Sequence, residues 1–128
     1  MAYLLDTHIV LWLANEPEQL TYEVQNLLMN KNERIYFSSV NIWEMAIKKK
    51  VRTDFQVDIP KLHRHLLIMQ YQELPVLAKH CYLVEHLPKI HNDPFDRLLI
   101  SQAMSENLTL ITHDTSILKY DNVKLLKA

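Results

Sequence analysis

Short apolar runs alternate with amphipathic segments along this chain. A continuous apolar run of a few residues is typical of a strand buried in a parallel sheet, whereas apolar residues at every third or fourth position are typical of a helix with one buried face. The alternation predicts a single α/β domain over residues 1–128, with helices on both faces of a parallel sheet. We expect strands at residues 2–5, 35–37, 108–112 and 122–126, and helices at 7–14, from Thr21, from Ser38 or Ser39 to 50, from Pro60, at 77–85, 94–107 and 114–120.

The helix that begins near residue 38 carries the sequence SSVNIWEMAIKKK. Val40, Trp43 and Ile47 are spaced as one buried face, and Glu44 falls on or beside that face. Because a carboxylate is rarely buried unless it is paired or bound to a metal, Glu44 has two interpretations. It is either a ligand that faces inward or a marginal residue that reaches water or pairs with Lys48. Other positions expected in the core are Leu11, Trp12 and Tyr22.

The composition excludes nucleotide-binding loops. The 128 residues are 48% hydrophobic, as in a globular protein, and include no glycine. A P-loop or a dinucleotide-binding fingerprint needs glycine so that the backbone can approach phosphate. Turns must instead use Asn, Asp and Pro.

The cysteine content and the apolar runs indicate the compartment. The single cysteine, Cys81, cannot form an internal disulfide, which favours a reducing compartment and therefore a cytoplasmic location. The first apolar run is broken by Asp6 and His8, so we expect no signal peptide. We also expect no membrane partner, because no apolar run approaches the roughly 20 residues that span a bilayer.

The formal net charge of −1 gives no general attraction to nucleic acid. Any RNA binding must therefore come from a local basic patch. The candidates for RNA contact are Lys48, Lys49, Arg52 and Arg97. The lysines can equally be a solvated helix end, where positive charge suits the helix dipole.

Acidic residues stand where parallel strands are expected to end. Asp6 directly follows the first strand, and Asp114 follows the strand at 108–112 with one residue between. Ligands of open parallel sheets bind beyond the carboxyl ends of the strands. Each aspartate can also be the N-cap of the next helix, and the sequence leaves both roles open.

The stretch HNDPFDRLLISQA combines a helix start with further acids. Asp93 suits the N-cap position, and Asp96 in the first turn is favoured by the helix dipole. Asp96 also begins the inward apolar side of this helix. It can therefore meet Asp6 and Glu44 at the edge of the sheet.

Several carboxylates in one cleft cannot all stay ionised without a cation. Mg²⁺ or Mn²⁺ accepts oxygen ligands and keeps water molecules for a phosphate substrate, so the acids support metal-assisted phosphodiester hydrolysis. Zinc is disfavoured, because no pair of the seven histidines has a ligand spacing beside a cysteine or a second acid.

Four segments, in this order, resemble the motifs of the PIN-domain nucleases. They are LLDTH at 4–8, SSVNIWEMAIK at 38–48, HNDPFDRLLISQA at 91–103 and LITHD at 110–114, and with their spacing they cover nearly the whole chain. The form DPFDRLLI is similar to the VapC-like toxins of type II toxin–antitoxin systems. Ser101 departs from the motif, which more often has alanine at that position.

The resemblance implies a three-layer α/β/α fold and an endoribonuclease that depends on Mg²⁺, with Mn²⁺ able to substitute. It also implies a homodimer and a cognate antitoxin whose C-terminal segment fills the active-site groove. The acids implied to bind metal and act in catalysis are Asp6, Glu44, Asp96 and Asp114. The supporting residues are Thr7, Ser38 and Thr112, with Asp93 as an additional acid beside the site.

Two other functions stay open at this point. The same fold with an inactive site would be an RNA- or protein-binding module, although a retained cluster of carboxylates argues against it. A phosphatase with Asp6 as its nucleophile would typically carry a second acid two residues on, where this chain has His8.

Overall fold

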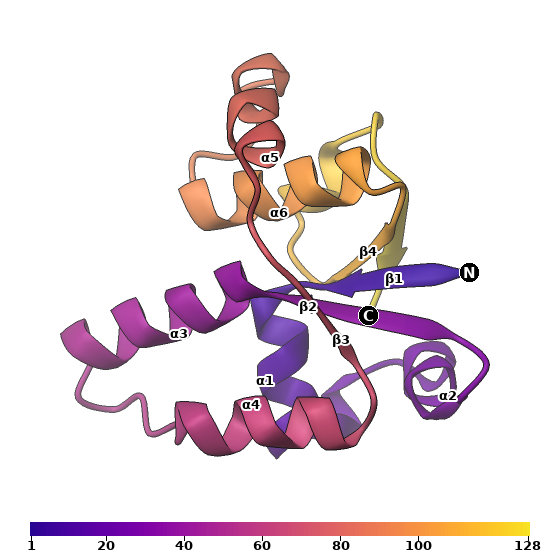
Figure 1. The fold of residues 1–128 in the computed structure, drawn as a ribbon, viewed down its shortest axis with the longest axis vertical. Helices are drawn as coiled ribbons and strands as arrows, with labels where there is room; N and C mark the ends of the chain where they lie inside the picture. The colour runs from indigo at the N-terminus through magenta and orange to yellow at the C-terminus, as the bar shows by residue number, and fades with distance from the viewer.

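Five strands run parallel in one sheet, in the order β3-β2-β1-β4-β5. The structure is a computed structural model that describes residues 1–128. Strand β1 (Ala2–Leu5) lies at the centre, between β2 (Arg34–Ser38) and β4 (Thr109–Thr112). The short strands β3 (Gln72–Leu74) and β5 (Leu125–Lys127) form the two edges (Figure 1). The predicted parallel sheet is confirmed.

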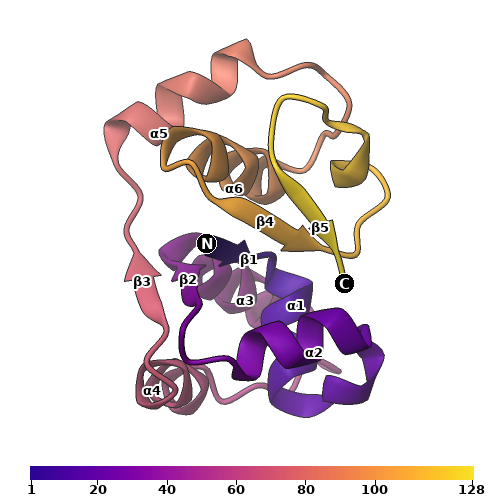
Figure 2. The ribbon, with the colours of Figure 1, turned by 90° about the vertical axis from the view of Figure 1, so that its right-hand side faces the viewer.

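Helices cover both faces of the sheet, which confirms the predicted three-layer α/β/α fold (Figure 2). One face is covered by α1 (Thr7–Asn15), α2 (Tyr22–Met29) and α4 (Ile59–Ile68), and the other by α5 (Ala78–Leu83) and α6 (Pro94–Ser105). Helix α3 (Ser39–Val51) begins where β2 ends and contacts α1, α4 and α6. None of these helices has the length and hydropathy that a membrane span requires. Three 3₁₀ turns complete the chain: η1 (Pro17–Gln19), η2 (Val84–His86) and η3 (Ile117–Lys119).

The side chains of the central strand divide the core into two halves. Tyr3 and Leu5 pack on the side of α1 and α2, whereas Leu4 packs on the side of α6. Successive side chains of a strand point to opposite faces, so both faces of β1 are buried. This double burial explains why the strand is a continuous apolar run instead of an alternating one.

The buried face of α3 differs from the expected one. Its buried residues are Val40, Asn41, Glu44 and Met45, while Trp43 is 53% exposed. Helix α3 contacts α1, α4 and α6, so its inward side faces polar groups at the sheet edge as well as the apolar core. The apolar spacing alone therefore selected the wrong face. Ile47 and Tyr22, also expected inside, are exposed, and Leu11 and Trp12 are partly buried.

Two other segments differ from the prediction in extent. Strand β3 was not expected, because Gln72 and Glu73 are polar and only Leu74 is buried. An edge strand needs only one buried side, which leaves a weak sequence pattern. The helix expected at 114–120 is reduced to the turn η3.

Without glycine, the chain uses other residues where the backbone turns left-handed. Only Gln70 and Asn107 have positive φ, at 67° and 56°. Asn107 lies two residues after the end of α6 and takes the conformation that commonly closes a helix. Asparagine tolerates this region better than most residues, which agrees with the prediction that asparagines supply the turns.

The assignment of the hydrophobic core can be tested at Leu110, which is fully buried in β4. We expect Leu110→Ala to lower the free energy of unfolding by about 2–5 kcal/mol, because the substitution removes buried methyl groups and leaves a cavity. The matched control is Leu67→Ala on α4, where the side chain is 47% exposed, with an expected change of about 0.5 kcal/mol or less. Urea unfolding measures both. Equal losses in the two variants would contradict the assignment of the core.

Candidate metal centre

Four acidic side chains meet at the carboxyl edge of the sheet. Asp6 follows β1, Glu44 lies on α3, Asp96 lies in the first turn of α6, and Asp114 follows β4. They line one cavity of about 280 Å³ whose lining includes no hydrophobic residue. The other lining residues are Thr7, His8, Lys48, Asp93 and His113.

Asp6 caps a helix and also lines the cavity, so the capping role does not remove its carboxylate from the site. Its Oδ1 accepts a hydrogen bond from the backbone N–H of Thr7 at 2.7 Å, which caps α1. Its Oδ2 accepts from the hydroxyl of Thr112 at 2.8 Å. The same hydroxyl accepts from the N–H of Asp114 at 3.0 Å. Thr112 therefore ties the acids after β1 and β4 to one another.

A buried amide joins the end of β1 to the start of α3. The Nδ2 of Asn41 donates to the carbonyl of Leu5 at 3.2 Å and to the hydroxyl of Thr7 at 2.9 Å, and its Oδ1 accepts from the N–H of Ser38 at 2.7 Å. The hydroxyl of Ser38 donates to Gln102 Oε1 on α6 at 2.6 Å. Thr7 and Ser38 thus fix the backbone around the acids, as supporting residues.

Sequence reasoning missed Asn41 and Gln102, although both are fully buried. Polar residues inside an amphipathic pattern look like surface positions, because the pattern does not show which neighbouring helix covers them. One feature of the sequence could have identified Asn41. It stands three residues after Ser38, where a side chain can complete a capping box, and the structure shows that box.

Glu44 has one satisfied oxygen and one unsatisfied oxygen. The residue is 6% exposed, and the distance from Oε2 to the Nζ of Lys48 is 3.1 Å. Oε1 is buried without a hydrogen-bond partner. A buried polar atom without a partner is destabilising, so this oxygen has an unmet need for a donor or a cation. Glu44 therefore faces inward and also pairs with Lys48, and its role as a metal ligand stays a prediction.

Burial and neighbouring negative charges both raise the pKa of Asp96. The side chain of Asp93 caps α6 by accepting from the N–H of Phe95 at 2.8 Å and from that of Asp96 at 3.3 Å. Burial, and then the negative charges of Asp6 and Asp93, raise the pKa of Asp96 to about 8. Burial raises the pKa of Asp6 to about 6, although the hydrogen bond from Thr112 acts in the opposite direction.

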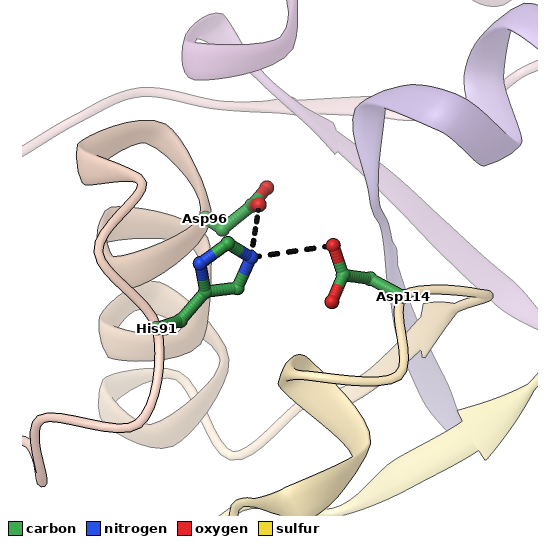
Figure 3. Close-up of side chains that lie close together, drawn as sticks. All are labelled: His91, Asp96 and Asp114. Atoms are coloured by element: carbon green, nitrogen blue, oxygen red, sulfur yellow. Dashed lines mark hydrogen bonds and ion pairs between the residues drawn. The ribbon is translucent and has the colours of Figure 1, made fainter.

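A histidine joins this group of acids. His91 Nε2 lies 2.9 Å from Asp96 Oδ2 and 3.2 Å from Asp114 Oδ2 (Figure 3). The three ligand atoms lie within 4.8 Å of one another. Sequence reasoning considered only pairs of histidines and did not single out His91. It compared histidines close to one another in sequence, whereas Asp114 lies 23 residues away along the chain.

Asp114 is held by its own turn. Its Oδ1 accepts from the N–H groups of Ser116 at 2.7 Å and Ile117 at 3.1 Å, and its Oδ2 faces His91. Burial pushes the pKa of Asp114 upward, but the hydrogen bonds from Ile117, His91 and Ser116 outweigh it, so the pKa is lowered.

Of the basic residues expected to contact RNA, Lys48 alone lines the cavity. Lys49 and Arg52 are exposed. The Nζ of Lys49 donates to the carbonyl of Val57 at 2.6 Å, and Arg52 pairs with Asp54 at 3.0 Å.

Arg97, also expected to contact RNA, makes several hydrogen bonds within the fold. Its guanidinium donates to backbone carbonyls in the segment before α6, at Pro88, His91, Val84 and Leu87, and to the hydroxyl of Tyr120. Through these hydrogen bonds Arg97 fastens residues 84–91 onto α6. Its expected contact with RNA stays a prediction.

Comparison with known families and structures gives one consistent result. The sequence model of the PIN domain matches residues 3–123. No curated protein sequence matches the chain.

Several solved structures share the fold over nearly the full length of both chains. VapBC2 from Rickettsia felis, bound to a DNA fragment from its promoter, has a TM-score of 0.70 and 24% identity, with 99% of this chain and 98% of that chain covered. VapBC-1 from nontypeable Haemophilus influenzae has a TM-score of 0.66 and 20% identity, with the same coverage. VapBC-5 from Mycobacterium tuberculosis, described as a member of the VapBC family of toxin–antitoxin systems, has a TM-score of 0.64 and 19% identity, with 99% and 98% covered. At these identities the likeness concerns the fold.

The raised pKa values predict how stability depends on pH in the absence of divalent cations. The folded chain holds the protons of Asp6 and Asp96 more tightly than an unfolded chain does, whose aspartates have a pKa near 3.8. This contribution to stability is complete below about pH 4 and is lost as the pH rises, through about 6 for Asp6 and about 8 for Asp96. We therefore expect the contribution of these two groups to the free energy of unfolding, measured in chelator, to fall between pH 5 and pH 8.

The variant Asp96→Asn isolates the larger shift, because it removes the titrating group while keeping the side-chain size. We expect a shallower decline with pH than in the unchanged protein. The control is Asp54→Asn, an exposed aspartate whose pKa is lowered by the hydrogen bond from Arg52, so it stays ionised over this range. A decline unchanged by Asp96→Asn would contradict the assignment.

Proposed function

The chain belongs to the PIN-domain family, and on that premise we propose that it is a metal-dependent endoribonuclease that acts as the toxin of a toxin–antitoxin pair. The proposal treats residues 1–128 as one nuclease domain. The residues proposed to bind metal and act in catalysis are Asp6, Glu44, Asp96 and Asp114.

One observation carries the proposal. Asp6, Glu44 and Asp96 come from three separate segments, are at most 8% exposed, and line the same cavity. The buried Oε1 of Glu44 has no partner, and the pKa of Asp96 is raised to about 8, so these carboxylates are under-compensated as they stand. An all-oxygen set of hard donors fits Mg²⁺ or Mn²⁺.

A bound divalent cation would activate a water molecule and neutralise charge at the phosphorus of an RNA phosphodiester. Asp6, Glu44 and Asp96 would hold that cation. Thr112 and the N–H of Thr7 keep the Asp6 carboxylate in one orientation, and Asn41 keeps the backbone of that loop in place. Preorganised groups of this kind need little rearrangement when charge develops during the reaction.

RNA binding rests chiefly on Lys48. Its ammonium group lines the cavity beside Glu44 and can attract a phosphate there. Lys49 and Arg52 follow it along α3 and just past its end, and extend positive charge away from the acids. We propose that these three residues guide the RNA backbone toward the carboxylates.

The partner we propose is an antitoxin protein, and its support is the set of neighbouring structures. These neighbours are VapBC assemblies, and VapBC-5 belongs to a family of toxin–antitoxin systems. The homodimer implied by the motifs stays a prediction, as does the cytoplasmic location inferred from the lone Cys81.

The direct test is cleavage of a mixed cellular RNA pool by the antitoxin-free protein with Mn²⁺ or Mg²⁺. We expect discrete fragments that disappear in chelator. We expect Asp96→Asn to cut about a hundredfold more slowly or worse, as when one preorganised electrostatic group is removed from an active site. Asp54→Asn, an exposed aspartate outside the cavity, should cleave like the unchanged protein.

Retained metal binding without any cleavage would favour the inactive RNA- or protein-binding module. Cleavage that survives chelation, or that Asp96→Asn leaves unchanged, would remove the acids from the mechanism.

The role of Lys48 can be measured separately from chemistry by RNA binding to the Asp96→Asn protein. We expect an added Lys48→Gln substitution to weaken binding and to reduce the dependence of log K on log salt by about 0.7, the value for one lost phosphate contact on single-stranded RNA. The matched control is Lys79→Gln, because Lys79 also pairs with a glutamate, at 3.0 Å, but lies outside the cavity. Equal effects of the two substitutions would exclude a specific contact by Lys48.

A further inference from the structure

His91 is the group at the site that the proposed chemistry does not use. It comes from the segment before α6, and its imidazole points between Asp96 and Asp114 (Figure 3). Its side chain is 17% exposed, against 12% for Asp96 and 34% for Asp114. The imidazole is thus partly buried between two carboxylates that belong to different elements of the fold.

Hydrogen bonding fixes which nitrogen of His91 carries the proton. The backbone N–H of Asp93 donates to Nδ1 at 3.2 Å, so Nδ1 is an acceptor. In an imidazole with one acceptor nitrogen, the other nitrogen is the donor. The proton therefore lies on Nε2, which is the atom at 2.9 Å from Asp96 Oδ2 and 3.2 Å from Asp114 Oδ2. A nitrogen that carries a proton has no lone pair for a metal ion.

The two oxygens beside this N–H, Oδ2 of Asp96 and Oδ2 of Asp114, are those a second cation would use. Two-metal sites place their ions about 3.5–4 Å apart, so a second ion needs carboxylate oxygens beside the first. Asp114 has no other free oxygen, because its Oδ1 already accepts from two N–H groups of its own turn. Asp96 keeps its Oδ1 for a first ion, together with Asp6 and the unpartnered Oε1 of Glu44.

We propose that the N–H of His91 stands in for a second divalent cation, so that this site binds one metal ion per chain. The inference rests on the proposed metal-dependent function and adds the number of ions and the residue that sets it. His91 is then a positioning residue that holds Asp96 and Asp114 together without becoming a ligand. Asp114, named above among the proposed metal-binding acids, then takes part through its bond to His91 and not by direct coordination.

The test is the number of Mn²⁺ ions bound by the metal-free protein, measured by titration calorimetry and by electron paramagnetic resonance. We expect one ion per chain and no spin coupling between ions. The variant His91→Asn keeps a short side-chain acceptor for the N–H two residues on, as asparagine commonly does in turns, but is too short to reach both carboxylates. We expect it to bind two ions per chain, with spin coupling between them.

Two controls keep the result specific. His113→Ala removes an imidazole that lines the cavity but has no hydrogen bond to any of the acids, and this variant should still bind one ion. The double variant His91→Asn with Asp114→Ala should return to one ion, because it removes the carboxylate that the second ion needs. Circular dichroism and thermal unfolding establish that each variant is folded before metal is added.

The outcomes separate this inference from the proposed function. Two ions in the unchanged protein, or one ion in folded His91→Asn, would overturn the role of His91 and leave the metal-dependent nuclease standing. No Mn²⁺ binding by the unchanged protein would overturn both. One ion that becomes two in His91→Asn and one again in the double variant would establish the inference.

Discussion

Repulsion between buried carboxylates is the constraint on which the site and its surroundings depend. Three acids that are each more than nine-tenths buried line one cavity, and like charges this close disfavour ionisation. The fold supplies a hydroxyl and a backbone N–H to Asp6 and an ammonium group to one oxygen of Glu44, and it places an imidazole 2.9 Å from one oxygen of Asp96. The Oε1 of Glu44 is buried and has no hydrogen-bond partner. This shortage of donors for buried carboxylate oxygens is a stronger reason to infer a bound cation than the number of acids is.

The acids can be held so close only because a rigid frame positions segments that are far apart in sequence. The N–H of Asp6 bonds to the carbonyl of Ile111 at 3.0 Å, which extends the pairing of β1 with β4 to the cavity. Asn41 and Gln102 then join α3 to β1 and to α6 through buried amides. A fully satisfied polar network of this kind favours one arrangement, because any shift leaves a buried group without its partner. The frame therefore supplies the precision that the chemistry requires.

The sequence predicted what depends on local pattern and on motif. Strand ends, helix starts and the acids attached to them follow from hydrophobic periodicity and capping, so Asp6, Glu44, Asp96 and Asp114 were found. The features that the sequence did not predict depend on tertiary packing. The inward side of α3 is chosen by its neighbours, the partners of Arg97 are backbone carbonyls, and His91 meets Asp114 only in the folded chain. His91 was nevertheless visible in the sequence, because it is the first residue of the motif at 91–103 that contains Asp96.

The two edge strands of the sheet affect how readily one chain pairs with another. Strands β3 and β5 have three residues each, and the exposed positions Gln72, Glu73 and Lys127 lie on them. Unpaired backbone at a sheet edge is a template for strands of other chains, and short edges with polar or charged side chains offer little of it. The short, polar outermost strands therefore disfavour edge-to-edge pairing between chains, whatever else the molecule binds.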